Sequence, residues 1–258
     1  MKGKIKRQLV FHHFTFTYPH SGLTAIDDLS CTVEQRQKVA IIGRTAAGKS
    51  TIADLILRMY DPTKGSIMVD GISLQDYELT SLRENIAYVP QDVFLFSDTI
   101  EANIKFGSQE SSREVVEQYA RHAAVYEDIM GLPEGFDTRI GERGITLSGG
   151  QKQRISIARA LIKHPEFVIL DDCLSAVDTQ TEHTIIDFLN KELSNKTAII
   201  ITHRILGMLD YDKILVIDHG KLVEEGTHDQ LISRHGHYYE LWQQQQVSGV
   251  LEEEDLVP

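Results

Sequence analysis

The sequence has few of the features that restrict a protein to a disulfide-rich or membrane-embedded class. Among 258 residues there are two cysteines, Cys31 and Cys173. That is too few for a disulfide framework, and they lack metal-ligand spacing. No apolar run approaches the roughly 18 residues of a membrane span, and no signal peptide opens the chain. We therefore expect two small buried cysteines and a reducing, cytosolic compartment.

An excess of basic residues is also missing, since 26 lysines and arginines face 38 acids and the net charge is −12. Phosphate backbones attract basic surfaces, so a broad nucleic-acid-binding face is not expected. Hydrophobic residues make up 41% and charged residues 25% of the chain, as in a soluble globular protein.

Short apolar runs alternate with helical patterns, which predicts a parallel sheet covered on both faces. Between residues 93 and 164 the β-branched runs disappear, and the spacing of Val115, Val116, Tyr119, Ala120 and Ala123 predicts a helical insertion. A hairpin is expected around Gly220, and a helix with a capping box at Thr227 and Gln230. The strands are expected at residues 11–18, 38–42, 66–71, 85–92, 167–170, 197–202 and 213–218.

A phosphate-binding loop follows the strand at residues 38–42. "IIGRTAAGKST" places Gly43, Gly48, Lys49 and Ser50 at the P-loop spacing, before a predicted helix. Backbone N–H groups of such a loop point at phosphate oxygens, and the helix N-terminus adds a positive dipole. We expect Lys49 to reach the β- and γ-phosphates of ATP and Ser50 to ligate Mg²⁺. The expected nucleotide-binding residues of the loop are Gly43, Arg44, Thr45, Ala46, Ala47, Gly48, Lys49, Ser50 and Thr51.

Two adjacent acids end the strand "FVIL". In P-loop nucleotide hydrolases a second strand ends in a carboxylate that holds the Mg²⁺ shell, a role that fits Asp171. Asp172 would then polarise the attacking water as a general base. The alternative interpretation of Asp172 is a turn or cap residue.

The segment "LSGGQKQRISIARAL" (residues 147–161) resembles the signature sequence of ABC-type ATPases, and the resemblance covers residues 8–244. It implies an α/β P-loop NTPase (RecA-like) fold, with a mostly parallel sheet, an antiparallel β subdomain and an inserted helical subdomain. It further implies that Tyr18 stacks on adenine, that Gln91 lies in the Q-loop near the metal, that "SAVD" ends at Asp178 as the D-loop, and that His203 is the switch histidine. The expected catalytic residues are Lys49, Gln91, Asp172 and His203. The expected Mg²⁺ ligands are Ser50, Gln91 and Asp171.

In this family the signature serves ATP bound to the opposite subunit, so the resemblance implies a second nucleotide-binding domain as partner, in a homodimer or heterodimer. The residues concerned are Ser148, Gly149, Gly150 and Gln151, which precede a helix; a hydroxyl and bare amides there form an anion site. The alternative interpretation is a glycine-rich helix cap.

The loop "GERG" with Glu142 resembles that of ABC exporters, where it contacts the coupling helices of the membrane domain. We expect the Gln91 and Glu142 regions to contact such helices on the cytoplasmic side of a membrane. The chain is then either the excised C-terminal part of a longer exporter or a separate product that docks on one. A soluble ABC ATPase of DNA repair or translation is a weaker alternative, which the acidic charge and the "GERG" loop disfavour.

Two positions depart from the family pattern. Ala46 stands where glycine is usual, which would cost on the order of 1 kcal/mol if the residue needs a positive φ. Asp172 stands where active members have Glu, and its arm is shorter by roughly 1 Å, a misplacement that can cost on the order of a hundredfold in rate. The pattern resembles the slow half of a heterodimeric exporter with unequal sites. The alternative is a nucleotide-gated clamp that hardly catalyses.

The expected organisation has four segments. Residues 1–92 form the P-loop core with the antiparallel β subdomain, and residues 93–164 form the helical subdomain with the signature. Residues 165–245 complete the core. Residues 246–258 form a tail that is expected to be disordered, because the glutamine run Gln243–Gln246 indicates the end of ordered structure. The alternative is a tail from an expression linker, since the final "LVP" could be the start of a protease-cleavable one.

Overall fold

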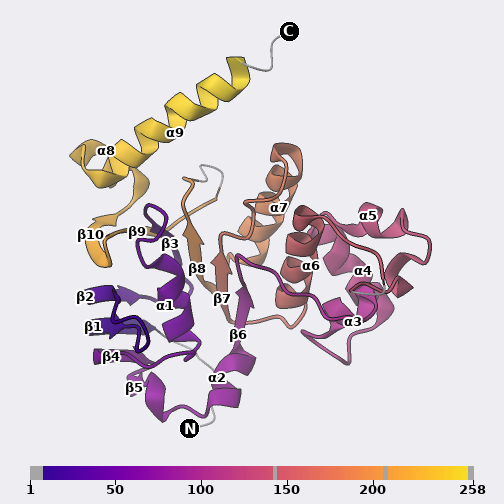
Figure 1. Ribbon diagram of the computed structural model, residues 1–258, viewed down its shortest axis with the longest axis horizontal. Coiled ribbons are helices and arrows are strands. Elements are labelled where there is room, and N and C mark those ends of the chain that lie inside the picture. The colour runs from indigo at the N-terminus through magenta and orange to yellow at the C-terminus, as the bar shows by residue number, and fades with distance from the viewer. Residues whose placement is uncertain (1–7, 142–143, 206–208, 255–258) are drawn as a thin grey trace. The chain divides into compact units, whose positions relative to one another are not determined.

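The computed structural model describes residues 8–141, 144–205 and 209–254 (Figure 1). Two compact units divide the chain, one of Met1–Arg83 with Thr197–Pro258 and the other of Glu84–Lys196. The segment 93–164, expected to be a helical subdomain, falls inside the second unit, which also contains two strands and a further helix.

The first unit is built from two sheets and the helices that join them. Its elements are β1 (Leu9–Thr17), β2 (Thr24–Val33), β3 (Lys38–Ile42), α1 (Lys49–Ile56), β4 (Lys64–Val69), β5 (Ile72–Ser73), η1 (Leu74–Asp76), α2 (Leu79–Asn85, which crosses into the second unit), β8 (Thr197–Thr202), β9 (Lys213–Asp218), β10 (Lys221–Gly226), α8 (His228–Arg234) and α9 (His237–Glu254).

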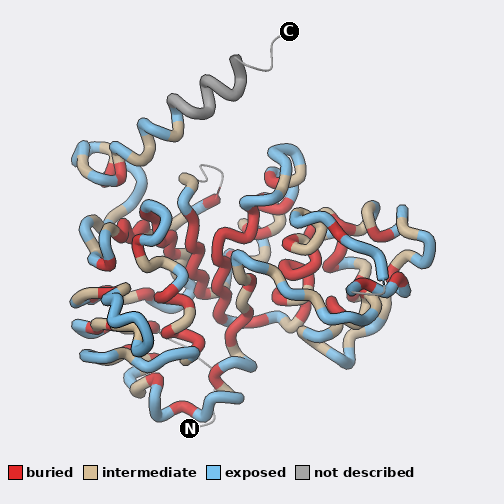
Figure 2. Tube along the Cα trace, in the orientation of Figure 1, coloured by how far each residue is buried: buried red, intermediate tan, exposed pale blue. Residues whose placement is uncertain are grey.

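The strands of the first unit confirm the expected mixture of a parallel core and an antiparallel sheet. β3 lies between β8 and β9 and is parallel to both, while β10 pairs antiparallel with β9 through the turn at Gly220. The other sheet has the order β2-β1-β4-β5, all antiparallel. β3 and β8 are buried almost throughout (Figure 2), which is why they are continuous apolar runs in the sequence.

The second unit holds the signature helix and the strand that ends in the acids. Its elements are β6 (Ile86–Val89), α3 (Ile100–Lys105), α4 (Arg113–His122), α5 (Tyr126–Met130), η2 (Gly135–Asp137), α6 (Gly149–Leu161), β7 (Phe167–Asp171) and α7 (Thr179–Glu192). β6 and β7 are parallel neighbours. α6 packs with α3 and α4, while η2 packs with α3 and α5. The predicted helical spacing is confirmed in α4, where Val116, Tyr119 and Ala120 are buried.

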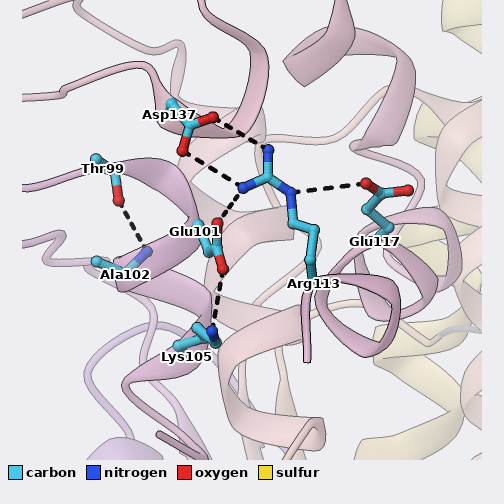
Figure 3. Close-up of polar contacts among 7 residues, drawn as sticks. All are labelled: Thr99, Glu101, Ala102, Lys105, Arg113, Glu117 and Asp137. Atoms are coloured by element: carbon cyan, nitrogen blue, oxygen red, sulfur yellow. Dashed lines mark hydrogen bonds and ion pairs between the residues drawn. The ribbon is translucent and has the colours of Figure 1, made fainter. Parts of the chain in front are cut away.

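Arg113 ties three of these elements together (Figure 3). Its guanidinium donates to Glu101 of α3, lies 3.4 Å from the Asp137 carboxylate of η2, and lies 3.6 Å from Glu117 one turn along α4. Glu101 also pairs with Lys105 at 3.0 Å. These side chains are partly exposed, so each pair contributes at most about 1 kcal/mol, and the network mainly fixes α3 and η2 against the start of α4.

One end of the fold differs from expectation. α9 continues to Glu254, through the glutamine run at which ordered structure was expected to end. Glutamine is a good helix former, so a run of it does not by itself stop a helix. Within the described residues, no helix combines the length and apolar character needed to cross a membrane.

Candidate functional site

The loop between β3 and α1 is shaped by backbone contacts that leave no room for side chains. A Cβ on Gly43 would lie 2.1 Å from the carbonyl oxygen of Ile217, and one on Gly48 would lie 2.4 Å from that of Ala25. Gly48 is also the N-cap of α1 with a φ of 98°, a conformation that glycine adopts without strain. These glycines are therefore required by close packing of the loop against β2 and β9.

Lys49 is the first residue of α1 and folds back over the loop. Its Nζ donates to the carbonyl oxygens of Gly43 and Arg44, both at 2.8 Å. A lysine ammonium, loop amides and a helix N-terminus together form a donor set that fits phosphate oxygens. Ala46 has a φ of 65°, so the positive φ considered from the sequence is present here.

Tyr18 follows β1 and is connected to the same helix. Its hydroxyl lies 3.0 Å from Oγ1 of the buried Thr51 in α1. Its ring makes T-shaped contacts with Phe16 at 4.9 Å and with Tyr60 at 5.6 Å. The P-loop helix and the aromatic ring expected to face adenine are thus brought together in the first unit. Tyr60 was missed in the sequence, because a tyrosine before a turn has no distinctive spacing.

The two acids at the end of β7 differ in their backbone. Asp171 is the last strand residue and 2% exposed, and Tyr88 Oη lies 3.5 Å from its Oδ2. Asp172 has a φ of 44°, in the left-handed region that Asp and Asn tolerate better than most residues. Gln91 Nε2 donates to Asp172 Oδ2 at 3.5 Å, the outer limit of a hydrogen bond. The structure therefore brings together the predicted Q-loop glutamine and the predicted general base.

Cys173, the next residue, is buried and chemically quiet. Burial, together with the neighbouring carboxylate of Asp172, raises the pKa of its thiol to about 12. The thiolate is the reactive form, so this cysteine is inert near neutral pH, in line with its interpretation as a small buried residue.

The signature residues form the start of α6. Ser148 is the N-cap, its Oγ accepting from Gln151 N at 3.2 Å while Gln151 Oε1 accepts from Ser148 N at 3.0 Å. A Cβ on Gly150 would lie 2.7 Å from the carbonyl oxygen of Ala176, so glycine is required there. In this structure the segment is a helix cap, which is the alternative interpretation given above. A helix N-terminus with bare amides is also compatible with the predicted anion site.

The predicted D-loop segment after the acids is fixed to α6 by a residue for which the sequence contains no signal. Gln153 Nε2 donates to Ser175 Oγ at 3.1 Å, and Gln153 Oε1 accepts from Ala176 N at 3.1 Å. Asp178 then caps α7, its Oδ1 accepting from Thr181 N at 3.0 Å. Hydrogen bonds with the backbone and side chain of Thr181 lower the pKa of the Asp178 carboxyl.

The comparisons with known proteins agree with this geometry. A family model described as "ABC transporter" matches residues 26–175, more than half of the chain. The chain belongs to the ABC transporter family. The fold prediction, an ABC-type P-loop NTPase, is confirmed.

The similar ABC proteins are much longer than this chain. A probable multidrug resistance ABC transporter ATP-binding/permease protein of Bacillus subtilis is 46% identical over 239 residues, which cover 93% of this chain and 41% of that protein. An ATP-dependent lipid A-core flippase of Pseudomonas fluorescens is 44% identical over 241 residues, covering 93% and 40%. A solved structure of a bacterial Atm1-family ABC exporter with ATP bound has a TM-score of 0.88 and 42% identity, covering 94% of this chain and 42% of that chain. The chain therefore spans about two fifths of the length of these exporters.

The residues predicted for the ABC motifs divide between the two units. The first unit holds Tyr18, the P-loop of residues 43–51 and His203, whose exposed side chain follows β8 directly. The second holds Gln91, the signature, Asp171, Asp172 and Asp178. Glu142, expected to contact a membrane domain, lies outside the described residues.

A groove in the second unit follows Gln91 in sequence. It has a volume of about 260 Å³ and is lined by the apolar residues Val93, Phe94, Leu95, Ile140, Ile145 and Leu147, together with Gly141, Thr146 and Lys152. Phe94 is 69% exposed, and Phe106 is 59% exposed; the rings of both contact Phe96, at 5.3 Å and 4.5 Å between centroids. Large exposed aromatic side chains of this kind mark interaction surfaces.

The backbone under these aromatic residues is fixed by buried polar groups. Asn103 is fully buried, and its Oδ1 accepts from Phe96 N at 2.8 Å and from Arg159 Nη2 at 2.7 Å. Arg159 Nη1 also donates to the Phe94 carbonyl at 2.9 Å, and burial lowers the pKa of Arg159 to about 10. The signature helix thus holds the aromatic segment in place.

Proposed function

We propose that this chain binds and hydrolyses ATP to drive export through a membrane domain of the kind carried by its longer ABC relatives. The observation that carries the proposal is the loop at the start of α1, where Lys49 lies over two carbonyls of a glycine-shaped loop. This donor set fits a triphosphate. In the proposal Tyr18 stacks on the adenine, and residues 43–51 hold the phosphates.

Mg²⁺ would be held by the Ser50 hydroxyl, Gln91 and the buried carboxylate of Asp171. These are oxygen donors, which a hard divalent cation prefers. When bound, the ion neutralises charge on the phosphates. Asp171 fits this role because it is an acid with 2% exposure at the end of a strand.

Asp172 is proposed as the general base that orients and deprotonates the attacking water, with His203 and Gln91 assisting and Lys49 stabilising charge on the phosphates. Its short arm is expected to make the site slow. The φ of 44° lies in the left-handed region that Asp adopts more readily than most residues, so Asp is compatible with this backbone. The runner-up function is a nucleotide-gated clamp in which Asp172 does not support turnover.

A second nucleotide-binding domain, identical or not, is the proposed partner. Ser148, Gly149, Gly150 and Gln151 would bind the γ-phosphate of ATP held by that domain, with Asp178 alongside. The support is the N-terminus of α6, a helix of 13 residues with two bare amides in its first turn. On this basis we expect ATP to shift the chain toward a dimer in light scattering, and Ser148→Arg to prevent the shift.

The apolar groove lined by Val93, Phe94 and Leu95, close after Gln91 in sequence, is the proposed contact with the coupling helices of the membrane domain, on the cytoplasmic side of the membrane. Its apolar lining and the exposed Phe94 support a protein partner. The Glu142 region is proposed to share this contact. A soluble ABC ATPase is less well supported, because the relatives are named as permeases, flippases and exporters.

Steady-state ATPase rates of the chain and two Asp172 variants test the proposal. Asp172→Asn should reduce kcat to background, and Asp172→Glu should raise it by about ten- to a hundredfold by restoring reach, with ATP affinity unchanged in both. If Asp172→Asn loses nothing and Asp172→Glu gains nothing, the clamp function is the correct one.

A further inference from the structure

The glutamine run Gln243–Gln246 has no role in the function proposed above, yet one of its members contacts the backbone around His203. We propose that Gln245 is a positioning residue for His203. The inference rests on the proposed role of His203 in ATP hydrolysis. It goes beyond that role by assigning part of the catalytic geometry to the C-terminal helix α9.

The contact has two hydrogen bonds of equal length. Gln245 Nε2 donates to the carbonyl oxygen of His203 at 2.8 Å, and Ile205 N donates to Gln245 Oε1 at 2.8 Å. A primary amide presents a donor and an acceptor side by side, so it matches the carbonyl and the N–H of two residues that flank Arg204. A carboxylate offers only acceptors and an apolar side chain offers neither.

The helix that carries Gln245, α9, packs against the apolar core of the first unit. Tyr238 of α9 is fully buried in a cluster with Ala40 and Val216, and Leu241 and Ile205 pack against the same cluster. Tyr238, Leu241 and Gln245 follow the spacing of one helix face. Ile205 is thus held by both the apolar core and the glutamine amide.

The start of α9 is fixed by polar contacts as well. The Tyr238 hydroxyl lies 2.8 Å from His228 Nδ1, and Tyr238 N donates to Glu224 Oε2 at 2.7 Å. Gln245 therefore reaches the loop from a helix whose orientation is set two turns earlier.

The backbone around His203 is also shaped by Thr202, the last residue of β8. Thr202 Oγ1 accepts from Arg204 N at 3.0 Å and donates to Arg204 O at 3.1 Å, which folds the chain sharply around His203. His203 is exposed and directly follows β8, so a shift of its backbone would move the imidazole. Catalytic groups must be held within about 0.5 Å of the productive geometry, and Gln245 supplies the hydrogen bonds from outside the loop.

Gln245→Leu tests the inference, with Gln246→Leu as the matched control from the same run, since Gln246 is exposed. In Gln245→Leu, kcat for ATP should fall about tenfold, as expected for a misplaced catalytic group. KM and ATP affinity should change less than twofold. Hydrogen exchange of the Ile205 amide should become about tenfold faster, because its acceptor is lost. Gln246→Leu should change none of these.

His203→Ala separates failure of the inference from failure of the proposed function. If His203→Ala leaves kcat unchanged, the proposed role of His203 is wrong. If His203→Ala lowers kcat but Gln245→Leu leaves it unchanged or raises it, only the positioning role is wrong. In the background of His203→Ala, adding Gln245→Leu should cause no further loss, since both changes act through the same imidazole. A further independent loss would mean that Gln245 is merely structural.

Discussion

Replacing Ala46 by glycine should stabilise the protein or leave it unchanged, although alanine-to-glycine changes usually destabilise. Ala46 has a φ of 65° and its side chain is exposed, so the methyl group contributes strain and little burial. An L-residue in this conformation costs roughly 1–2 kcal/mol. Glycine removes that cost but adds about 0.5–1 kcal/mol of unfolded-state entropy. The expected net gain is about 0.5 kcal/mol.

The neighbouring Ala47 provides the control. Ala47 is 6% exposed, and unlike Ala46 it does not have a positive φ. Ala47→Gly carries the same unfolded-state cost and also loses a buried methyl group worth about 0.8 kcal/mol. The entropy cost cancels between the two variants, so Ala46→Gly should be more stable than Ala47→Gly by roughly 2 kcal/mol.

Urea denaturation of both variants measures this difference directly, and Tm should differ by about 4–8 °C for a chain of this size. ATP affinity of Ala46→Gly should stay within twofold of the parent chain. Equal destabilisation by the two substitutions would refute the reasoning, because it would mean that Ala46 carries no backbone strain.

Three further predictions concern the aromatic contacts and the buried polar groups. Arg159→Met should reduce the free energy of unfolding by about 3 kcal/mol in urea denaturation, since it removes charged hydrogen bonds inside the second unit; a loss below about 0.5 kcal/mol would contradict this. Burial lowers the pKa of His122, and Glu192 opposes the shift. The unfolded chain therefore binds the imidazole proton more tightly than the folded chain, and the free energy of unfolding should fall as the pH drops below about 6.5. That slope should be smaller in His122→Phe, and an unchanged slope would exclude His122 as its source. Tyr60→Ala should weaken ATP binding about two- to tenfold through loss of its ring contact with Tyr18. Its affinity for tripolyphosphate should not change, and Tyr60→Phe should bind ATP as the parent chain does. Equal loss of affinity for ATP and tripolyphosphate in Tyr60→Ala would contradict the assignment.

Much of the core could be predicted because its signals are local. β3, β8 and β9 have the predicted bounds, since an uninterrupted apolar run is both the signal and the reason for burial. The capping box at Thr227 was also predictable, because it needs only residues three positions apart and the structure contains it.

β2 was missed for a physical reason. Its sequence carries Asp27 and Asp28 in the middle, and Asp28 has a φ of 54°. The pairing of β1 with β2 shifts register near Phe14, so the apolar residues lose the strict alternation by which a strand is predicted.

Long-range polar contacts were the other gap. Gln91 and Asp172 were each named from their motifs, but their 3.5 Å contact depends on how residues 81 positions apart are folded. Gln245 gave no signal at all, because one glutamine in a run of four is indistinguishable from its neighbours until the helix face is known. Contacts of this kind follow from tertiary packing, which local patterns do not encode.

The binding of Mg²⁺-ATP to this chain and to Lys49→Ala, measured by calorimetry, tests the central claim most directly. The claim predicts one saturable site per chain, weakened about ten- to a hundredfold in Lys49→Ala through loss of charged hydrogen bonds to the phosphates. An affinity for ATP that is independent of Lys49, or no binding by the parent chain, would contradict it.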